Sequence, residues 1–295
     1  PGGYPEASFG FGYEASGNCG RYSKIYLNDP SMPNPVDTPD FQDKEYIGIP
    51  VDELDENLST GFDLFIRTGN SYILFHSSEK PLTDRIITRI RNKVSSDYIY
   101  VRAADQNRYL RYTMNKLQCP ADREGFGLEE RNSLFYNTAV SIVKNTFYKP
   151  RKEAAVIARE LVESMLSLMI PEENPIADMV NIVSRDPYIY VHSVNVAVIG
   201  TALAVKVIEK EDELRDVAFG LLMHDIGKSF IERDVLLKPR KLSREEWNLM
   251  KEHPRKGIDI LREIGHLNKT VRTVTMQHHE RCDGSGYPLG LKREW

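Results

Sequence analysis

Hydrophobic residues recur at two different periods along this chain, and the change of period separates two structured regions. Between residues 46 and 101, short apolar runs are divided by turn residues such as Thr68-Gly69-Asn70, which is typical of strands joined by tight turns. One stretch carries isoleucines at helical spacing and predicts an amphipathic helix over 81–94. Strands are predicted at 46–51, 62–66, 72–75 and 98–101. Residues 43–117 are therefore predicted to form a small α+β domain.

After residue 131 the apolar positions recur every three to four residues, which predicts helices throughout. Helices are expected at 134–147, 154–170, 176–183, 190–210, 212–223, 258–264 and 270–279. A further helix begins at Ser243, because Glu246 follows at the spacing of a capping box. It is expected to carry Trp247, Met250 and His253 on one face and to kink or end at Pro254. The predicted fold class is thus mainly α, an all-α bundle after a small α+β domain.

Composition adds two segments without regular structure. Residues 1–42 are rich in Gly, Tyr, Ser, Asn and Pro and predict a flexible leader, with an aromatic hairpin as the alternative. Residues 118–130 carry Pro120 and two glycines among charges and predict a linker to the helical domain, 131–295. The chain starts at Pro1 and stops at Trp295, soon after its most informative motif, and is interpreted as partial or processed.

Charge and cysteine content narrow the classes of function. The 295 residues carry a net charge of −4, which argues against binding of nucleic-acid polymers or of membrane surfaces. The three cysteines are far apart and odd in number, so a disulfide framework is not expected and the cytoplasm is the predicted compartment. No apolar run reaches the ~18 residues that a membrane span requires.

The candidate chemistry lies in the helical region, where six of the seven histidines occur. His224 and Asp225 offer an imidazole and a carboxylate side by side, and a carboxylate can bridge two metal ions. Lys228 adds a positive charge suited to a phosphate oxygen. Further candidate ligands are His192, His253, His278 and His279, whereas His76 and His266 are interpreted as ordinary histidines.

Helical bundles commonly build metal sites from side chains that converge from facing helices. Neighbours such as His278 and His279 point about 100° apart on a helix, so the pair suits a centre with two metal ions. Several imidazoles with one or two carboxylates fit Fe or Mn first, with Zn and Ni as further options. The absence of a thiolate cluster argues against a structural zinc site.

The motifs together resemble the HD-GYP family, the bacterial phosphodiesterases of cyclic di-GMP. The resemblance covers about residues 130–295 and implies an HD-type helical bundle. It rests on the His224-Asp225 pair with Gly227-Lys228, on the segment from Leu237 to Trp247, on His253, and on a long motif. That motif reads His278-His279-Glu280-Arg281-Cys282-Asp283-Gly284-Ser285-Gly286-Tyr287-Pro288. Residues 46–117 are similar, more weakly, to an accessory module found in front of such domains.

The resemblance implies a role for each matching residue. Two divalent ions would be bound by His192, His224, Asp225, His253, His278 and His279. Lys228 and Asp225 would be the catalytic residues, with Lys228 contacting the scissile phosphate. Gly286, Tyr287 and Pro288 would form the loop that borders the substrate.

Two features depart from the family pattern. Some relatives hold a third metal with a Glu one turn before the first histidine, but this chain has Tyr188 there, and Asp186 is only a remote candidate. The family also places a metal-binding Asp and basic substrate residues after the Gly-Tyr-Pro loop, beyond Trp295. We therefore expect two metals and a centre that lacks one ligand within this chain.

The predicted function is metal-dependent hydrolysis of cyclic di-GMP to pGpG or GMP. The first alternative is a degenerate domain that senses the nucleotide or docks onto signalling proteins through the Gly-Tyr-Pro loop or the N-terminal module. The second is hydrolysis of another nucleotide by a general HD phosphohydrolase, which has no need of that loop. A homodimer is a further expectation that the sequence leaves open.

Overall fold

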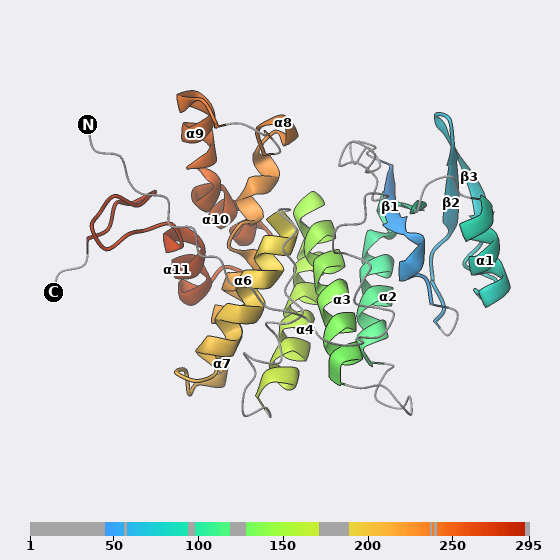
Figure 1. Cartoon of the computed structure of the whole chain (residues 1–295), viewed down its shortest axis with the longest axis horizontal. Helices are drawn as coiled ribbons and strands as arrows, with labels where there is room; N and C mark the ends of the chain where they lie inside the picture. The colour runs from blue at the N-terminus through green and yellow to red at the C-terminus, as the bar shows by residue number, and fades with distance from the viewer. Residues whose placement is uncertain are drawn as a thin grey trace, which may run out of the picture. The chain divides into compact units, whose positions relative to one another are not determined.

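The computed structural model describes most of the chain from residue 45 onwards (Figure 1). The described residues are 45–55, 58–93, 98–118, 128–170, 189–236, 238 and 241–292. The predicted leader 1–42, most of the predicted linker and the helix expected at 176–183 lie outside them. So do Asp186 and Tyr188, the positions considered for a third metal.

The N-terminal region holds an antiparallel four-stranded sheet of order β1-β4-β2-β3. Its strands are β1 (Tyr46–Pro50), β2 (Leu64–Thr68), β3 (Ser71–His76) and β4 (Tyr98–Arg102). The apolar runs predicted as strands lie within two residues of these bounds, because turn residues such as Gly69, with φ of 61°, end the runs locally. The predicted helix corresponds to α1 (Asp84–Lys93), and short 3-10 turns occupy Val51–Glu53 (η2) and Ala103–Asp105 (η3).

Helix α2 (Gln106–Gln118) follows η3 in a stretch for which the sequence analysis predicted no element. It buries Tyr109, Leu110, Tyr112 and Met114. Two of these are tyrosines, whose low helix propensity and polar hydroxyl groups weaken the local signal. Tertiary packing against α3 (Leu128–Tyr148) and α4 (Lys152–Met169) stabilises the helix instead.

The helical region begins with α3 and α4, which pack side by side with α6 (Ile189–Ala204) and α7 (Glu211–Met223) (Figure 1). Helix α6 ends six residues before the predicted boundary at residue 210, and a turn over residues 205–207 leads to α7. The buried faces of these helices are rich in Ala, Val, Leu and Met, which allows close approach of neighbouring helices. The predicted fold class, mainly α with a small α+β part, is confirmed.

Shorter elements complete the helical region. They are η5 (Ile226–Phe230), α8 (Arg233–Leu236), α9 (Arg244–Met250), α10 (His253–Glu263) and α11 (Lys269–Gln277). The capping box predicted at Ser243 and Glu246 is present at the start of α9. The prediction that His253 continues this helix was wrong. The helix ends at Met250, and His253 starts α10 with Pro254 in the first turn, where proline is tolerated.

One hydrophobic cluster extends from the sheet through α2 into α3, α4, α6 and α7. It includes residues from both sides of the predicted linker, for example Ile99 and Leu110 on one side and Ile142 and Leu161 on the other. A hydrogen bond also connects the two sides: the Gln106 side-chain amide in α2 donates to the Asn145 carbonyl in α3 at 2.8 Å. Among the described residues, no helix combines the length and apolar character needed to cross a bilayer.

Candidate metal centre

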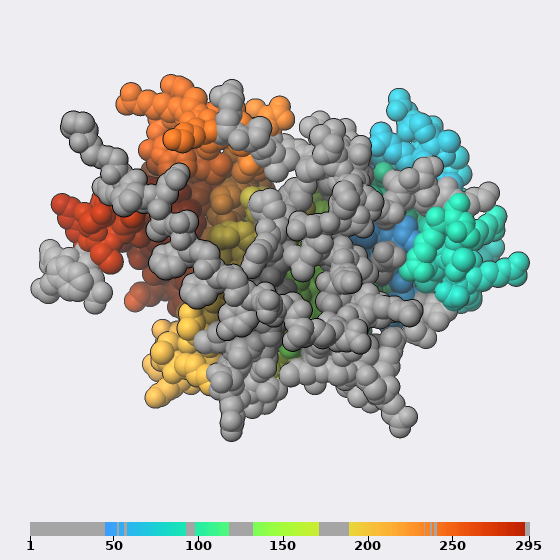
Figure 2. Space-filling view, in the orientation of Figure 1, coloured from blue at the N-terminus to red at the C-terminus, as the bar shows by residue number. Residues whose placement is uncertain are grey.

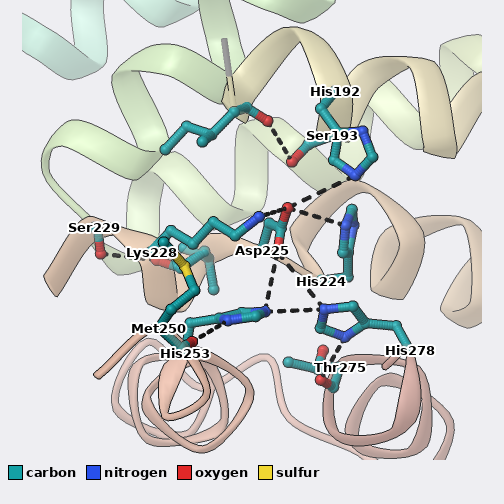
Figure 3. Close-up of polar contacts among 12 residues, drawn as sticks. His192, Ser193, His224, Asp225, Lys228, Ser229, Met250, His253, Thr275 and His278 are labelled. Carbon is teal, nitrogen blue, oxygen red and sulfur yellow. Dashed lines mark hydrogen bonds and ion pairs between the residues drawn. The ribbon is translucent and has the colours of Figure 1, made fainter. Parts of the chain in front are cut away.

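The carboxylate of Asp225 lies at the middle of the candidate site, directly after α7 (Figure 3). The residue is only 1% exposed, and its Oδ1 atom is buried with no hydrogen-bond partner among the described residues. A buried, unpaired carboxylate oxygen is costly unless a cation or a donor compensates it. This atom is therefore a specific reason to expect a ligand here.

The two oxygens of Asp225 face two different groups of histidines (Figure 3). Oδ1 lies 3.2 Å from Nε2 of His253 and 3.6 Å from Nε2 of His278. Oδ2 lies 3.3 Å from Nε2 of His224 and 3.8 Å from Nε2 of His192.

Two sets of possible metal ligands share this carboxylate. The first consists of Asp225, His253, His278 and His279, and the second of His192, His224 and Asp225. Within each set the ligand atoms lie within 4.8 Å of one another. A carboxylate common to both is the arrangement that bridges two ions. The structure thus brings together all six residues predicted as metal ligands, whereas His76 and His266 belong to neither set.

Three helix ends position the histidines. Nδ1 of His224 contacts the Leu221 carbonyl at the end of α7 at 2.7 Å. His253 contacts the Met250 carbonyl at the end of α9, and His278 the Thr275 carbonyl of α11, at 2.7 and 2.9 Å. These carbonyls belong to last turns, where helices leave acceptors unsatisfied. The partial negative charge of three helix C-termini also favours a cation between them.

These contacts fix the tautomers, because a carbonyl oxygen can only accept. Each Nδ1 must therefore carry the proton, and a neutral ring then presents a lone pair at Nε2. Nε2 of His253 and Nε2 of His278 lie 3.0 Å apart, so two lone pairs face each other beside Oδ1 of Asp225. A cation that accepts all of these lone pairs resolves the repulsion. The residues present therefore fit a divalent metal.

The charge states of the ligands agree with this interpretation. Burial lowers the pKa of His278. Burial, followed by repulsion from His278 and His253, lowers the pKa of His279 to about 3. Neutral imidazole and ionised carboxylate are the forms that bind metals.

Lys228 lies on η5, one turn after Asp225, and its Nζ donates to Oδ2 of Asp225 at 2.7 Å (Figure 3). Its side chain is 17% exposed, so the ammonium group sits at the edge of the centre. Gly227 allows η5 to approach α10, because a Cβ atom there would lie 1.9 Å from the His253 carbonyl oxygen. The glycine of the motif is therefore a packing requirement that holds two ligands together.

The Gly-Tyr-Pro loop packs directly on His279. A Cβ atom on Gly286 would lie 2.4 Å from the backbone nitrogen of Arg281, so only glycine permits this close approach. The Tyr287 backbone N–H donates to the His279 carbonyl at 3.2 Å. The Tyr287 ring stacks on the His279 ring with centroids 4.5 Å apart, and the Pro288 carbonyl accepts from Arg255.

Glu280 has a role that the sequence analysis did not assign. Its carboxylate accepts backbone N–H groups from Leu289 and Leu291 at 2.6 and 2.7 Å, and from Gly290 at 3.3 Å. The residue thereby ties the end of the loop to the start of the motif, next to His279. Its place directly after the histidine pair was the only available signal, because the three donors are backbone groups.

Comparison with known proteins identifies the family. Residues 177–295 match the HD domain family. These residues are an HD domain. The match contains all of the candidate ligands and the Gly-Tyr-Pro loop, so the resemblance predicted from the motifs is confirmed.

Two similar proteins are named as cyclic di-GMP phosphodiesterases. The cyclic di-GMP phosphodiesterase PA4108 of Pseudomonas aeruginosa is 34% identical over 137 residues, which are 46% of this chain and 33% of that protein. The cyclic di-GMP phosphodiesterase response regulator RpfG of Xanthomonas campestris pv. campestris is 45% identical over 87 residues, which are 28% of this chain and 22% of RpfG. This chain therefore spans a third or less of the length of these two relatives.

A solved structure shares the fold. Bd1817, a HDG"Y"P protein from Bdellovibrio bacteriovorus, aligns with a TM-score of 0.59 and 21% sequence identity. The alignment covers 84% of this chain and 81% of Bd1817. It therefore includes much of the N-terminal region in addition to the HD domain.

Proposed function

We propose that this chain is a metal-dependent phosphodiesterase that hydrolyses cyclic di-GMP to pGpG or GMP. The observation that carries the proposal is the carboxylate of Asp225, shared between two sets of histidine ligands and contacted by Lys228. The substrate comes from the similarity to relatives that are named cyclic di-GMP phosphodiesterases. The cytoplasm is the compartment that agrees with this substrate.

Two divalent ions fit the donor set, with Fe or Mn preferred and Zn or Ni as further options. Imidazole and carboxylate donors without thiolates support this order. When bound, a pair of such ions supplies an activated water and stabilises negative charge on a phosphoryl group. The second set, His192, His224 and Asp225, holds one donor fewer than the first.

The residues of the chain itself would perform three tasks. The helix-end carbonyls orient His224, His253 and His278, so that no reorganisation is needed when a ligand binds. Lys228 would donate to a phosphate oxygen and stabilise the charge that develops in the transition state. Gly286, Tyr287 and Pro288 would border the substrate on the side of His279.

Anaerobic turnover tests the proposal directly. The protein is incubated with Fe(II) or Mn(II) and cyclic di-GMP, and the products are separated by chromatography. We expect pGpG or GMP only when metal is present, and we expect both products to disappear in His224→Ala. The matched control is His266→Ala, because His266 lies in the same region but belongs to neither ligand set. Loss of activity in both variants would contradict the assignment of ligands.

Other outcomes of this experiment would favour the two alternative functions. Nucleotide binding without metal-dependent turnover would overturn the proposal and favour the degenerate domain, which senses the nucleotide or binds signalling proteins. Turnover of other cyclic or linear nucleotides at equal rates would favour a general HD phosphohydrolase instead. Light scattering of the same sample tests the expected homodimer.

A further inference from the structure

Helix α9 lies at the surface and contributes no buried residue to the core (Figure 2). Its stability is local, because the capping box of Ser243 and Glu246 closes its first turn and Lys238 forms an ion pair with Glu246. The helix ends at Met250, whose carbonyl orients the ligand His253. A surface helix is thus held firmly beside the metal centre without being needed to fill the core.

The central residue of this helix is Trp247, which is 46% exposed. Its ring meets the ring of Tyr287 edge to face, with centroids 5.9 Å apart and an angle of 77° between the planes. Tyr287 in turn stacks on the ligand His279. A continuous series of aromatic rings therefore leads from the surface to the metal ligands.

Packing alone gives little reason for this tryptophan. A tryptophan that contributes to a core buries most of its area, whereas nearly half of Trp247 stays in contact with solvent. Exposed indole faces next to a phosphate-binding group are the usual means of holding a nucleobase, because every base offers a flat π-face. Lys228 supplies a cationic group at the same cluster, where it donates to Oδ2 of Asp225.

We propose that Trp247 stacks against a purine base of the dinucleotide whose phosphate is held at the metal centre. This inference rests on the proposed function for the identity of the ligand. Trp247 is then a substrate-binding residue supplied by α9, and Tyr287 positions its ring by the edge-to-face contact. The HD domain would recognise the nucleotide at two places, the phosphate through Lys228 and the base through Trp247.

Three substitutions at this position separate stacking from packing. Trp247→Phe keeps an aromatic face, Trp247→Leu keeps an apolar side chain without one, and Trp247→Ala removes both. We expect Leu and Ala to raise KM for cyclic di-GMP about tenfold or more, as loss of one stacked base does, while kcat changes less. Trp247→Phe should stay within a few-fold of the parent protein. Metal content and thermal melting are measured for each variant, so that a loss of fold is recognised.

The matched control is Leu249→Ala. Leu249 is 44% exposed on the same helix but points about 200° away from Trp247, because successive residues turn by about 100°. We expect the KM of the Leu249→Ala variant for cyclic di-GMP to be unchanged. An equal effect of Leu249→Ala and Trp247→Ala, or a Trp247→Leu variant as active as Trp247→Phe, would overturn the inference.

Fluorescence gives a readout that does not require turnover. The chain has two tryptophans, so Trp295→Phe leaves Trp247 as the sole indole fluorophore. Cyclic di-GMP added to this variant with Mn(II) should quench the emission in a saturable manner, whereas inorganic phosphate should not. Quenching without turnover would support the base contact while refuting the proposed catalysis. Turnover without quenching would refute the base contact alone.

Discussion

Two largely buried polar clusters in this protein differ in how well their charges and hydrogen bonds are matched. The metal-centre cluster consists of Asp225 and its histidines, and the tyrosine cluster consists of Glu53, Tyr109 and Ser141. In the tyrosine cluster the Tyr109 and Ser141 hydroxyl groups both donate to the Glu53 carboxylate, the second at 3.1 Å. In the metal-centre cluster a carboxylate oxygen and two imidazole lone pairs face one another.

The difference separates a structural cluster from a binding site. The tyrosine cluster connects η2, α2 and α3, and its donors and acceptors satisfy one another without any ligand. Burial, followed by the nearby Glu53, raises the pKa of Tyr109 well above its usual value, so its hydroxyl remains a donor. The metal-centre cluster becomes complementary only when a cation is added. A buried set of acceptors that face one another without donors therefore marks a site suited to a cation.

The strongest test of this comparison replaces the shared carboxylate. Asp225→Asn keeps the shape but removes the charge common to both ligand sets. We expect metal content to fall and turnover to drop by roughly 10²-fold or more, since loss of partners outside the ligand shell alone costs 10–100-fold. Elemental analysis and product formation measure the two effects.

The matched control is Glu53→Gln, which makes the same chemical change in the tyrosine cluster. It should lower stability but leave metal content and turnover as they are. Equal losses of metal in both variants would show that the two clusters do not differ in the way proposed.

The next prediction concerns stability with and without metal. A ligand that binds only the folded state at 100 times its Kd stabilises that state by about 2.7 kcal/mol. We expect Mn(II) to raise Tm and a chelator to reverse the change, as measured by scanning calorimetry. Glu53→Gln should show the same increase, whereas Asp225→Asn should show none. A metal-induced increase that survives in Asp225→Asn would place the ion elsewhere.

The candidate ligand residues could be singled out from the sequence because most of them lie in recognisable motifs. The geometry that makes them a centre could not. The sequence does not reveal that the Leu221, Met250 and Thr275 carbonyls orient the imidazoles, because backbone acceptors leave no residue-specific signal. The donors that hold Glu280 were hidden for the same reason.

Element boundaries show the same division between local and tertiary information. The start of α9 could be predicted, because Ser243 and Glu246 form a local capping box. Its end could not, because Trp247, Met250 and His253 keep helical spacing across a break at residues 251–252. Helix α2 was missed because its stability comes from burying tyrosines against α3, which is tertiary packing rather than local propensity.

A smaller effect is expected from the tyrosine cluster itself. Tyr109→Phe removes the hydroxyl that donates to Glu53 and leaves the carboxylate with Ser141 as its remaining donor in this cluster. We expect the free energy of unfolding to fall by about 1.5–3 kcal/mol, the range for a hydrogen bond to a charged group. Urea unfolding measures this loss. The increase in Tm on adding Mn(II) should be unchanged, and a reduced increase would mean that the two clusters are coupled.

The smallest effect comes from a matched cluster at the surface, where solvent competes with each contact. Asp63 accepts the Ser78 backbone N–H at 2.9 Å and the Ser78 hydroxyl at 3.1 Å, and lies 3.6 Å from Arg102. The backbone donor is the largest cause of a lowered Asp63 pKa, and burial opposes it. A depressed folded-state pKa stabilises the protein above the unfolded value of about 3.9 and loses that stabilisation as the pH falls through the folded value. Urea unfolding should therefore find the parent protein more stable than Asp63→Asn at neutral pH, with the gap closing in acid. A gap that stays constant with pH would assign the effect to side-chain shape instead of charge.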